Sequence, residues 1–461
     1  MNNQDYETLT SNHENNIKKH KSFKNLKTWQ KVTCIAGLAL VLAGAGGATA
    51  YILTHKDNST TTANTTPISS ATFSNSSTNE ITLQDGKNEI TSGGVYHITG
   101  STSNGWLTID TSEAVEIILD NVTISTSENQ AIRSKQENSV LIKLIGTNKL
   151  TSSVPTSSDT KPAISIAGSL TIEGEGSAEI SSTGKGIKAV YALVISSGTI
   201  DITKSSEGLE AADITISGGD IKITASDDGI NASSTAKNEA TGESTTESTQ
   251  SNDPRGMMMG GGGMMGGIDV NDGSALTISG GKLYINASGD GIDSNGNVTI
   301  SGGEIYVDGP ANAGNGALDY NGEMTITGGT LIAVGMSGMA QNATTASQPS
   351  LLINLSATKS GQLSLGDLTF TPTKSYNSIL ISSPTLSTGQ TYDLKISGST
   401  AQSVTISDNI TTVGTASNIP GGGASGDKMQ MNNNTPSNTS SNIPTEDSTN
   451  RPQQMMQRNR Q

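Results

Sequence analysis

A unit of about 22 residues recurs between residues 185 and 335, and it restricts the fold more than any other feature of the chain. Each copy has a Gly-containing acidic turn, a short alternating strand, a Gly-Gly or Ser-Gly corner and a second alternating strand. The first apolar residue of the short strand marks each copy: Leu193, Ile214, Leu276, Val298 and Met324. Neighbouring markers are 21, 22 and 26 residues apart, and the one gap of 62 equals about one unit plus an insertion.

Two strands per unit at a fixed period are typical of a stacked solenoid, because no unit can bury its apolar face alone. Strict alternation points pairs such as Ile214 and Ile216 toward one side of the strand. Since the same strand recurs in the same direction at every turn, the pairing is predicted to be parallel. The fold class is therefore all-β, a parallel β-helix.

Composition agrees with this architecture and restricts the partners. Aromatic residues make up only 3% of the 461 residues, and the formal net charge is −15. Residues 1–56 carry seven lysines and three acids, so the remainder is even more acidic than the whole. Such a chain is a poor partner for nucleic acid and a suitable one for divalent cations.

The N-terminal region predicts export. Residues 1–31 are polar and basic, and they read as a cytoplasmic segment. Residues 32–54 are uncharged and long enough to cross a bilayer, which places the rest of the chain outside the cell. This segment is either a permanent single-pass signal-anchor in the cell membrane or a cleaved signal peptide, with secretion as the alternative location. The one cysteine, Cys34, lies within it, so the exported part has no disulfide.

The remaining boundaries follow from composition. Residues 55–79 predict a Ser/Thr-rich stalk, and residues 80–348 the β-helix. A low-complexity insertion at 232–267 ends in a Met/Gly run, which reads as a disordered loop or as a soft adhesive surface. The period is lost at 349–413, a predicted C-terminal β cap, and residues 414–461 predict a disordered tail.

An acidic column is expected on one turn of the coil, because residues one period apart stack. Its members are Glu207, Glu210, Asp227, Asp228, Asp269, Asp272, Asp290, Asp293 and Asp319. Successive coils lie about 4.8 Å apart, so stacked carboxylates repel unless a cation neutralises them. Oxygen ligands of this kind suit Ca²⁺, whereas ordinary Asp-Gly turn chemistry is the alternative reading. Lys188 occupies this column in the preceding coil, so a metal ladder is expected to start after it.

Two further columns face outward. Tyr284 and Tyr306 are predicted stacked neighbours on the second strand, where they either receive sugar rings or stabilise the sheet by packing. A threonine column is predicted on the first strand, interrupted by Val194: Thr171, Thr215, Thr277, Thr299 and Thr325. Such a flat polar face could lie along an ordered polymer, with Thr277 and Thr299 at its centre.

The residues give little support for catalysis. Arg133 is the one arginine expected in the coil, and His97 is the one exported histidine beyond His55. Neither has the setting of a lyase base or of a Ser/His/Asp site. Four lysines remain possible bases, although none has a distinctive setting: Lys185, Lys188, Lys204 and Lys222. Carboxylates could serve a glycosidase, but here they recur in every unit, as structural features do.

The chain resembles the bacterial carbohydrate-binding domain-containing family over roughly residues 80–410. The resemblance lies in VEIILDNVTIS, LTIEGEGSAEI, ITISGGDIKITASDDGIN and LTISGGKLYINASGDGIDSNGNVTISGG, and in the Met/Gly-rich insertion. It implies a right-handed, calcium-binding, polysaccharide-lyase-like β-helix that binds cellulose or acidic sugars without catalysis. The matching positions are Asp227, Asp228, Asp290 and Asp293, whereas Lys185 and Glu207 depart from the family pattern.

The expected function is that of an extracellular, membrane-anchored, calcium-stabilised protein that binds polysaccharide and has no catalytic activity. The alternatives are a structural or adhesive cell-surface protein, and a polysaccharide lyase. Nucleic acid is not an expected partner.

Overall fold

The computed structural model describes residues 66–73, 76–155, 161–234 and 271–416. The predicted membrane segment, most of the insertion and the tail lie outside these ranges. Within them, no helix is long and apolar enough to cross a membrane. The described part is all-β apart from two short 3-10 helices, η5 (Ser70–Phe73) and η6 (Ser337–Met339). Residues 70–73 fall within the predicted stalk, yet Phe73 is buried.

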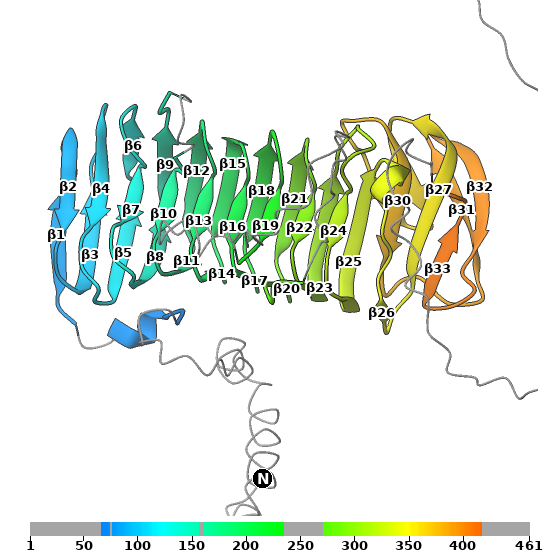
Figure 1. Ribbon diagram of the computed structural model, residues 1–461, viewed down its shortest axis with the longest axis horizontal. Coiled ribbons are helices and arrows are strands. Elements are labelled where there is room, and N and C mark those ends of the chain that lie inside the picture. The colour runs from blue at the N-terminus through cyan, green and yellow to red at the C-terminus, as the bar shows by residue number, and fades with distance from the viewer. Residues whose placement is uncertain (1–65, 74–75, 156–160, 235–270, 417–461) are drawn as a thin grey trace, which may run out of the picture. The chain divides into compact units, whose positions relative to one another are not determined.

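The strands form a parallel coil whose turns stack side by side, as Figure 1 shows. Each regular turn contributes one strand to each of three faces. The strands of the first face are β1 (Thr78–Thr82), β3 (Gly94–Thr99), β5 (Val115–Asp120), β8 (Ser139–Ile145), β11 (Ser169–Gly174), β14 (Ala192–Ile195), β17 (Asp213–Ile216), β20 (Ala275–Ile278) and β26 (Thr345–Ala346).

The strands of the second face are β6 (Thr123–Thr126), β9 (Thr147–Ser152), β12 (Ser177–Ser182), β15 (Thr199–Ser205), β18 (Asp220–Ala225) and β21 (Lys282–Ala287). Two long strands, β23 (Asn297–Asp308) and β25 (Met324–Gly335), run through both faces and join them into one sheet of 20 strands.

The third face is a separate sheet of nine strands. These are β2 (Gly86–Ile90), β4 (Gly105–Ile109), β7 (Ile132–Ser134), β10 (Ile164–Ile166), β13 (Ile187–Ala189), β16 (Leu209–Ala211), β19 (Ile230–Ala232), β22 (Ile292–Ser294) and β24 (Leu318–Tyr320). The prediction of two strands per unit is therefore wrong. Part of the predicted acidic turn is a third strand, only three residues long in each regular coil.

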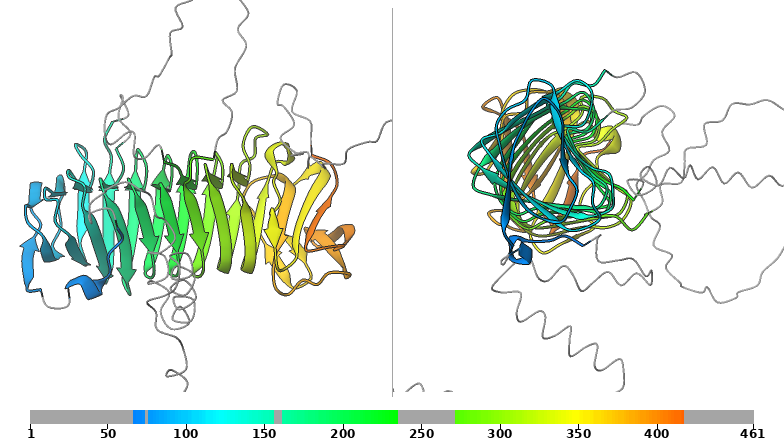
Figure 2. Two further views of the ribbon diagram at one scale, coloured as in Figure 1. Left: turned by 60° about the horizontal axis from the view of Figure 1, so that its bottom comes forward. Right: turned by 90° about the vertical axis from the view of Figure 1, so that its left-hand side faces the viewer.

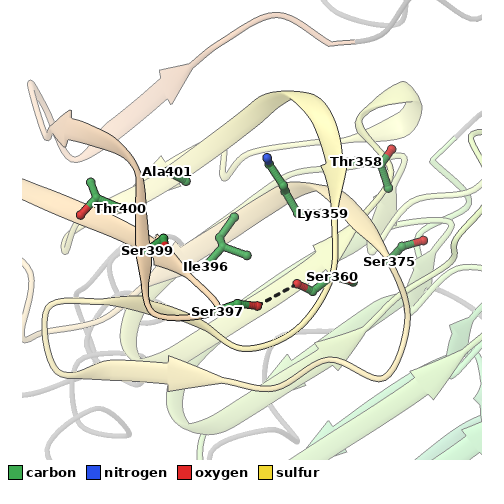
Figure 3. A pocket seen from close by; sticks show the side chains of 9 residues that line it. All are labelled: Thr358, Lys359, Ser360, Ser375, Ile396, Ser397, Ser399, Thr400 and Ala401. Atoms are coloured by element: carbon green, nitrogen blue, oxygen red, sulfur yellow. Dashed lines mark hydrogen bonds between the residues drawn. The ribbon is translucent and has the colours of Figure 1, made fainter.

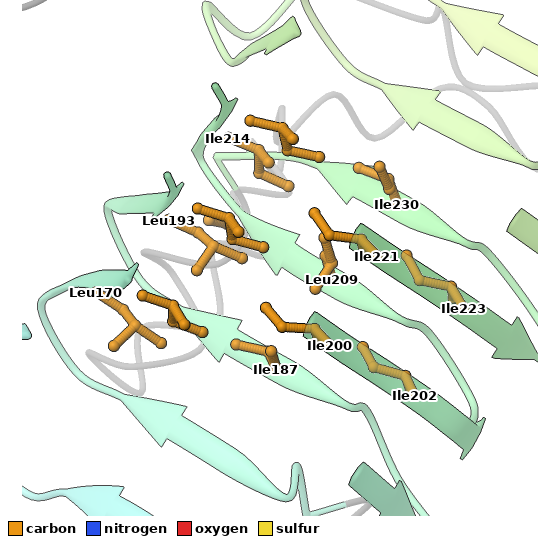
Figure 4. Packing of buried hydrophobic residues seen from close by; sticks show 14 of the residues in the cluster. Leu170, Ile187, Leu193, Ile200, Ile202, Leu209, Ile214, Ile221, Ile223 and Ile230 are labelled. Atoms are coloured by element: carbon orange, nitrogen blue, oxygen red, sulfur yellow. The ribbon is translucent and has the colours of Figure 1, made fainter. Parts of the chain in front are cut away.

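The predicted core markers are confirmed. Leu193 pairs with Ile214, Ile214 with Leu276, and Leu276 with Val298, and all four are buried. The gap of 62 residues is thus a single step from one coil to the next. Leucine and isoleucine side chains from all three faces stack in rows inside the coil (Figure 4). Viewed along the long axis, successive coils superimpose (Figure 2).

The strands after residue 349 depart from the parallel coil. β27 (Ser350–Lys359) and β33 (Ile410–Val413) are parallel, while β30 (Tyr376–Ser382) runs antiparallel to β25 and β27. A small antiparallel sheet follows, made of β28 (Leu363–Leu365), β29 (Leu368–Phe370), β31 (Thr391–Ile396) and β32 (Ser399–Thr405). These strands share a second apolar cluster with the last coils, so they shield the end of the stack.

Candidate functional site

The acidic column lies on the third face and on the turn before it. In β16, β19 and β22 the first and third residues are buried, and in β24 the first residue is buried. The middle side chain of each strand therefore points outward. The middle residues stack in register from one coil to the next: Lys188, Glu210, Asn231, Asp293 and Asp319. The stacking of Asp293 on Asp319 and the place of Lys188 before Glu210 are as predicted, but Asn231 occupies the position between Glu210 and Asp293.

A second row of acids stacks on the preceding turn. The Gly208 amide donates to the Asp228 carbonyl (3.0 Å), and the Gly229 amide donates to the Asp290 carbonyl (2.9 Å). The Asp228 carboxylate accepts from the Asp290 amide at 2.7 Å. A Cβ on Gly289 would lie 2.4 Å from Asp228 Oδ1, so a side chain there would displace this carboxylate. Glycine thus allows the carboxylates to pack against the next coil.

Glu207 and Glu210 are neutralised by lysine rather than left for a cation. Lys185 Nζ lies 2.7 Å from Glu210 Oε2 and 3.4 Å from Glu207 Oε1, and Lys188 Nζ lies 3.4 Å from Glu210 Oε2. The Glu210 side chain is only 3% exposed. A buried carboxylate needs such partners. The prediction that these two glutamates ligate metal is therefore not supported by their contacts.

Within the described residues, no comparable cation pairs with three acids of the following coils. Among the ion pairs between described residues, none involves Asp228, Asp290 or Asp293. Burial is the largest cause that raises the pKa of Asp228 to about 7, of Asp290 to about 6 and of Asp293 to about 8. Repulsion from neighbouring acids, Asp319 among them, adds to all three shifts. A cation beside these half-buried acids would stabilise their ionised form.

Asn231 belongs to this group, and the sequence interpretation did not single it out. Its Nδ2 lies 3.3 Å from Glu207 Oε2, whereas its Oδ1 is buried and has no hydrogen-bond donor. Asn231 is in register with Asp293, the acid whose pKa is raised to about 8, so the two residues stack on neighbouring coils. The signal was available in the sequence, because Asn231 follows Glu210 by one period of 21 residues.

The donor set matches a hard cation in chemistry but is not an assembled cage. No three His, Cys, Asp or Glu side chains within the described ranges are grouped so that they could hold one metal ion. What the coil offers is carboxylates in pairs on adjacent turns, such as Asp293 and Asp319, together with the Asn231 oxygen. Any ion would also need ligands from the main chain or from water.

The other three predicted acids differ in their surroundings. Asp227 is exposed on the turn, one residue before Asp228, and its negative charge helps to raise the pKa of Asp228 and of Asp290. Asp269 lies outside the described residues. Asp272 is not in the column: its carboxylate accepts from the Ser234 amide (2.8 Å) and the Ser274 amide (2.9 Å) at the corner before β20. It fixes this corner of the coil, so its prediction as a column member is wrong.

Tyr284 and Tyr306 stack in register, as predicted, but they do not form an open platform. Their ring centroids lie 6.3 and 5.5 Å from that of Phe370 on β29, and both rings pack against the apolar cluster of the C-terminal strands. Phe370 itself is 6% exposed. The contacts favour the packing interpretation over sugar stacking, because the C-terminal sheet occupies the position a sugar ring would need.

The threonine column of the first face is confirmed as a structural feature. Thr171 pairs with Val194, Val194 with Thr215, Thr215 with Thr277, and Thr277 with Thr299, followed by Thr325. The last four threonines are half-buried, so part of each hydroxyl-bearing side chain reaches solvent, whereas Thr171 is buried.

Four further hydroxyl residues follow these threonines and were missed in the sequence. Each lies two residues after a threonine, at the end of the first face or just beyond it: Ser217, Ser279, Ser301 and Thr327. We call these four residues together with Thr215, Thr277, Thr299 and Thr325 the hydroxyl face. It spans four adjacent coils.

Comparisons with known proteins agree with the predicted resemblance. A family model described as carbohydrate-binding domain-containing protein matches residues 84–248. A solved structure of the polysaccharide lyase-like protein from C. thermocellum, a gadolinium derivative, is 23% identical with a TM-score of 0.40. The match covers 54% of this chain and 96% of that chain. No curated protein matches the chain.

Proposed function

We propose that this chain is a non-catalytic carbohydrate-binding protein whose coil binds a polysaccharide along the hydroxyl face. The match of residues 84–248 to a carbohydrate-binding domain-containing family supports a glycan ligand. The observation that carries the proposal is the row of Thr215, Thr277, Thr299 and Thr325, which repeats the same outward hydroxyl on four paired strands. A regular array of this kind suits a regular polymer such as cellulose.

The proposed location is the outer side of the cell membrane. The basic segment 1–31 and the apolar segment 32–54 support an anchor with the coil outside, and cleavage of the segment would give a secreted protein instead.

Retention of the full-length chain on insoluble glycans tests the proposal. The protein is purified in detergent micelles and incubated with cellulose, pectin and host glycans, with and without a chelator. We expect the protein to sediment with at least one of these polymers. Failure to sediment with any of them would refute the binding function.

The contacts of the candidate basic residues support a non-catalytic role. Lys185 contacts two carboxylates, so it is not available as a base. His97 lies between Glu80 Oε2 (2.8 Å) and Asp120 Oδ2 (3.1 Å), and its hydrogen bond to Asp120 is the main cause that raises its pKa. Appearance of unsaturated products from polygalacturonate would instead support a lyase.

We propose further that Ca²⁺ occupies the acidic column beyond the lysine pairs. Its ligands would be Asp228, Asp290, Asp293, Asp319 and the Asn231 oxygen. The ion would supply a positive charge that no ion pair among the described residues gives to Asp228, Asp290 or Asp293. Raised carboxyl pKa values and the buried Asn231 Oδ1 support this assignment. Because the ion would join carboxylates from adjacent turns, it would stabilise the stack rather than act on a substrate.

Calcium is expected to raise the melting temperature of the full-length chain by about 5 °C. A free Ca²⁺ concentration of about 100 times Kd stabilises the folded chain by about 2.7 kcal/mol. Each kcal/mol of stability raises the Tm of a large domain by about 2 °C. Thermal melting followed by circular dichroism, with chelator and with Ca²⁺, measures this. The paired variant Asp293→Asn/Asp319→Asn should lose the shift, whereas Asp220→Asn, an exposed acid of the second face, should keep it.

The same melting experiments at several pH values test whether the stability changes with pH in the expected direction. Burial raises the pKa of Asp228, Asp290 and Asp293, so without Ca²⁺ these groups favour folding most below about pH 3.8 and lose that contribution as the pH rises through about 6 to 8. The calcium-free parent should therefore gain stability relative to the paired variant on acidification. Added Ca²⁺ should oppose this trend, because binding requires the ionised carboxylates. A calcium-insensitive Tm at pH 8 would contradict the assignment.

A further inference from the structure

A hollow of about 480 Å³ opens in the C-terminal strands, apart from the acidic column and the hydroxyl face. It lies between the end of β27 and the β31–β32 hairpin (Figure 3). The residues that line it are Thr358, Lys359, Ser360, Ser375, Ile396, Ser397, Ser399, Thr400 and Ala401. Its volume is in the range of small-ligand sites, and it is large enough for a single sugar residue.

The rim of the hollow is held in place before any ligand binds. Ser397 (φ 51°) and Gly398 (φ 80°) form a two-residue turn that matches the twist of the β31–β32 hairpin. The Ser397 amide donates to the Gln362 carbonyl at 2.8 Å, and its hydroxyl donates to the Ser360 carbonyl at 3.3 Å. The segment that this turn contacts is itself held, because the fully buried Tyr376 donates to the Gly361 carbonyl at 3.0 Å. Both edges are thereby fixed relative to each other, which reduces the entropy lost on binding.

The lining chemistry is unusual for so acidic a chain. Six of the nine residues carry hydroxyls, one is lysine, and none is acidic. Among ion pairs between described residues, none involves Lys359, so its ammonium is available to a ligand. Ile396 supplies an apolar contact between the polar groups. A cation would find no carboxylate here, and a purely apolar ligand would bury many hydroxyls without partners.

We propose that this hollow binds one carboxylated sugar residue, a uronic acid, of a glycan. Lys359 would pair with the carboxylate, and the surrounding serine and threonine hydroxyls would exchange hydrogen bonds with the sugar hydroxyls. The proposal rests on the proposed carbohydrate-binding function and adds to it a second, charge-selective subsite at the end of the coil. A charge-assisted hydrogen bond is stronger than a neutral one, so the acid should bind better than the neutral sugar.

Calorimetric titration of the full-length protein tests this subsite. The probes are methyl galacturonoside, the neutral methyl galactoside and acetate. We expect Kd for the uronoside to be about tenfold lower than for the galactoside, as one charge-assisted contact would give. Acetate should bind much more weakly than the uronoside, because it lacks the hydroxyls. Equal binding of all three probes, or equal binding of acetate and uronoside, would refute a sugar subsite.

Two lysine variants assign the effect to the hollow. Lys359→Gln should raise Kd for the uronoside about tenfold, to the value for the galactoside. Lys395→Gln removes the same charge from an exposed residue that does not line the hollow, and should leave Kd within about twofold. Unchanged uronoside binding by Lys359→Gln would overturn the inference. Retention of that variant on insoluble glycan tests the main function separately, since the hydroxyl face is intact in it.

Discussion

Replacing Thr277 and Thr299 together by lysine is expected to reduce retention on the bound polysaccharide at least tenfold. Both side chains point outward on adjacent coils of the first face and are half-buried between their neighbours. Two longer side chains would lift the polymer from the neighbouring hydroxyls. A tenfold loss of affinity corresponds to about 1.4 kcal/mol. Sedimentation with the polymer measures the effect.

A matched variant separates this surface from general changes of charge. Thr147 and Thr199 are exposed on the second face and both align with Ser177, so they lie two coils apart on the same column. Their joint replacement by lysine adds the same charge and should leave retention within about twofold. Both variants should melt close to the parent, because outward lysines are tolerated on strands. Equal loss of retention in the two variants would show that charge, rather than the hydroxyl face, decides binding.

Replacing Gly296 by alanine is expected to destabilise the coil by roughly 3 kcal/mol, the upper end of what overpacking costs. A Cβ on Gly296 would lie 1.7 Å from the carbonyl oxygen of Ser274 on the preceding coil. That carbonyl accepts from the Asn297 amide at 3.1 Å, so relief of the clash would break a bond between coils. The Tm should fall by roughly 6 °C, since each kcal/mol corresponds to about 2 °C in a large domain.

Gly314→Ala provides the control for this substitution. Gly314 has no left-handed backbone conformation, and an added Cβ would meet only Asn312 Oδ1 at 3.6 Å, an ordinary contact. Its Tm should stay within about 1 °C of the parent. If Gly296→Ala melts like Gly314→Ala, the coils do not approach each other as closely as the structure shows.

The sequence predicted the parallel coil and most of its register, because identical side chains recur at a nearly constant spacing. The markers Leu193 and Ile214, and the columns of Thr277 and Tyr284, follow directly from that period. The third strand was missed because a run such as Leu209–Ala211 is too short to show alternation and follows a glycine, like a turn. The period predicts which residues are in register from coil to coil, but it does not predict how many strands each coil has.

The period also could not show which outward columns are covered. Phe370 packs on Tyr284 and Tyr306 from more than 60 residues downstream, in a segment without the repeat. Likewise, the neutralisation of Glu210 by Lys185 depends on a diagonal contact between coils, whereas the column read from the sequence aligns it with Lys188. Because long side chains reach from one column to another, the pairing of charges could be seen only in the three-dimensional structure.

Thiol labelling in the presence of the polysaccharide tests directly where the polymer lies. In a Cys34→Ser background, which removes the one native thiol, Thr299→Cys on the hydroxyl face is compared with Thr199→Cys on the second face. With polymer bound, the rate of maleimide modification at position 299 should fall about tenfold, as a buried contact would require, while the rate at position 199 should not change. Protection of position 199 with full reactivity at position 299 would contradict binding along the hydroxyl face.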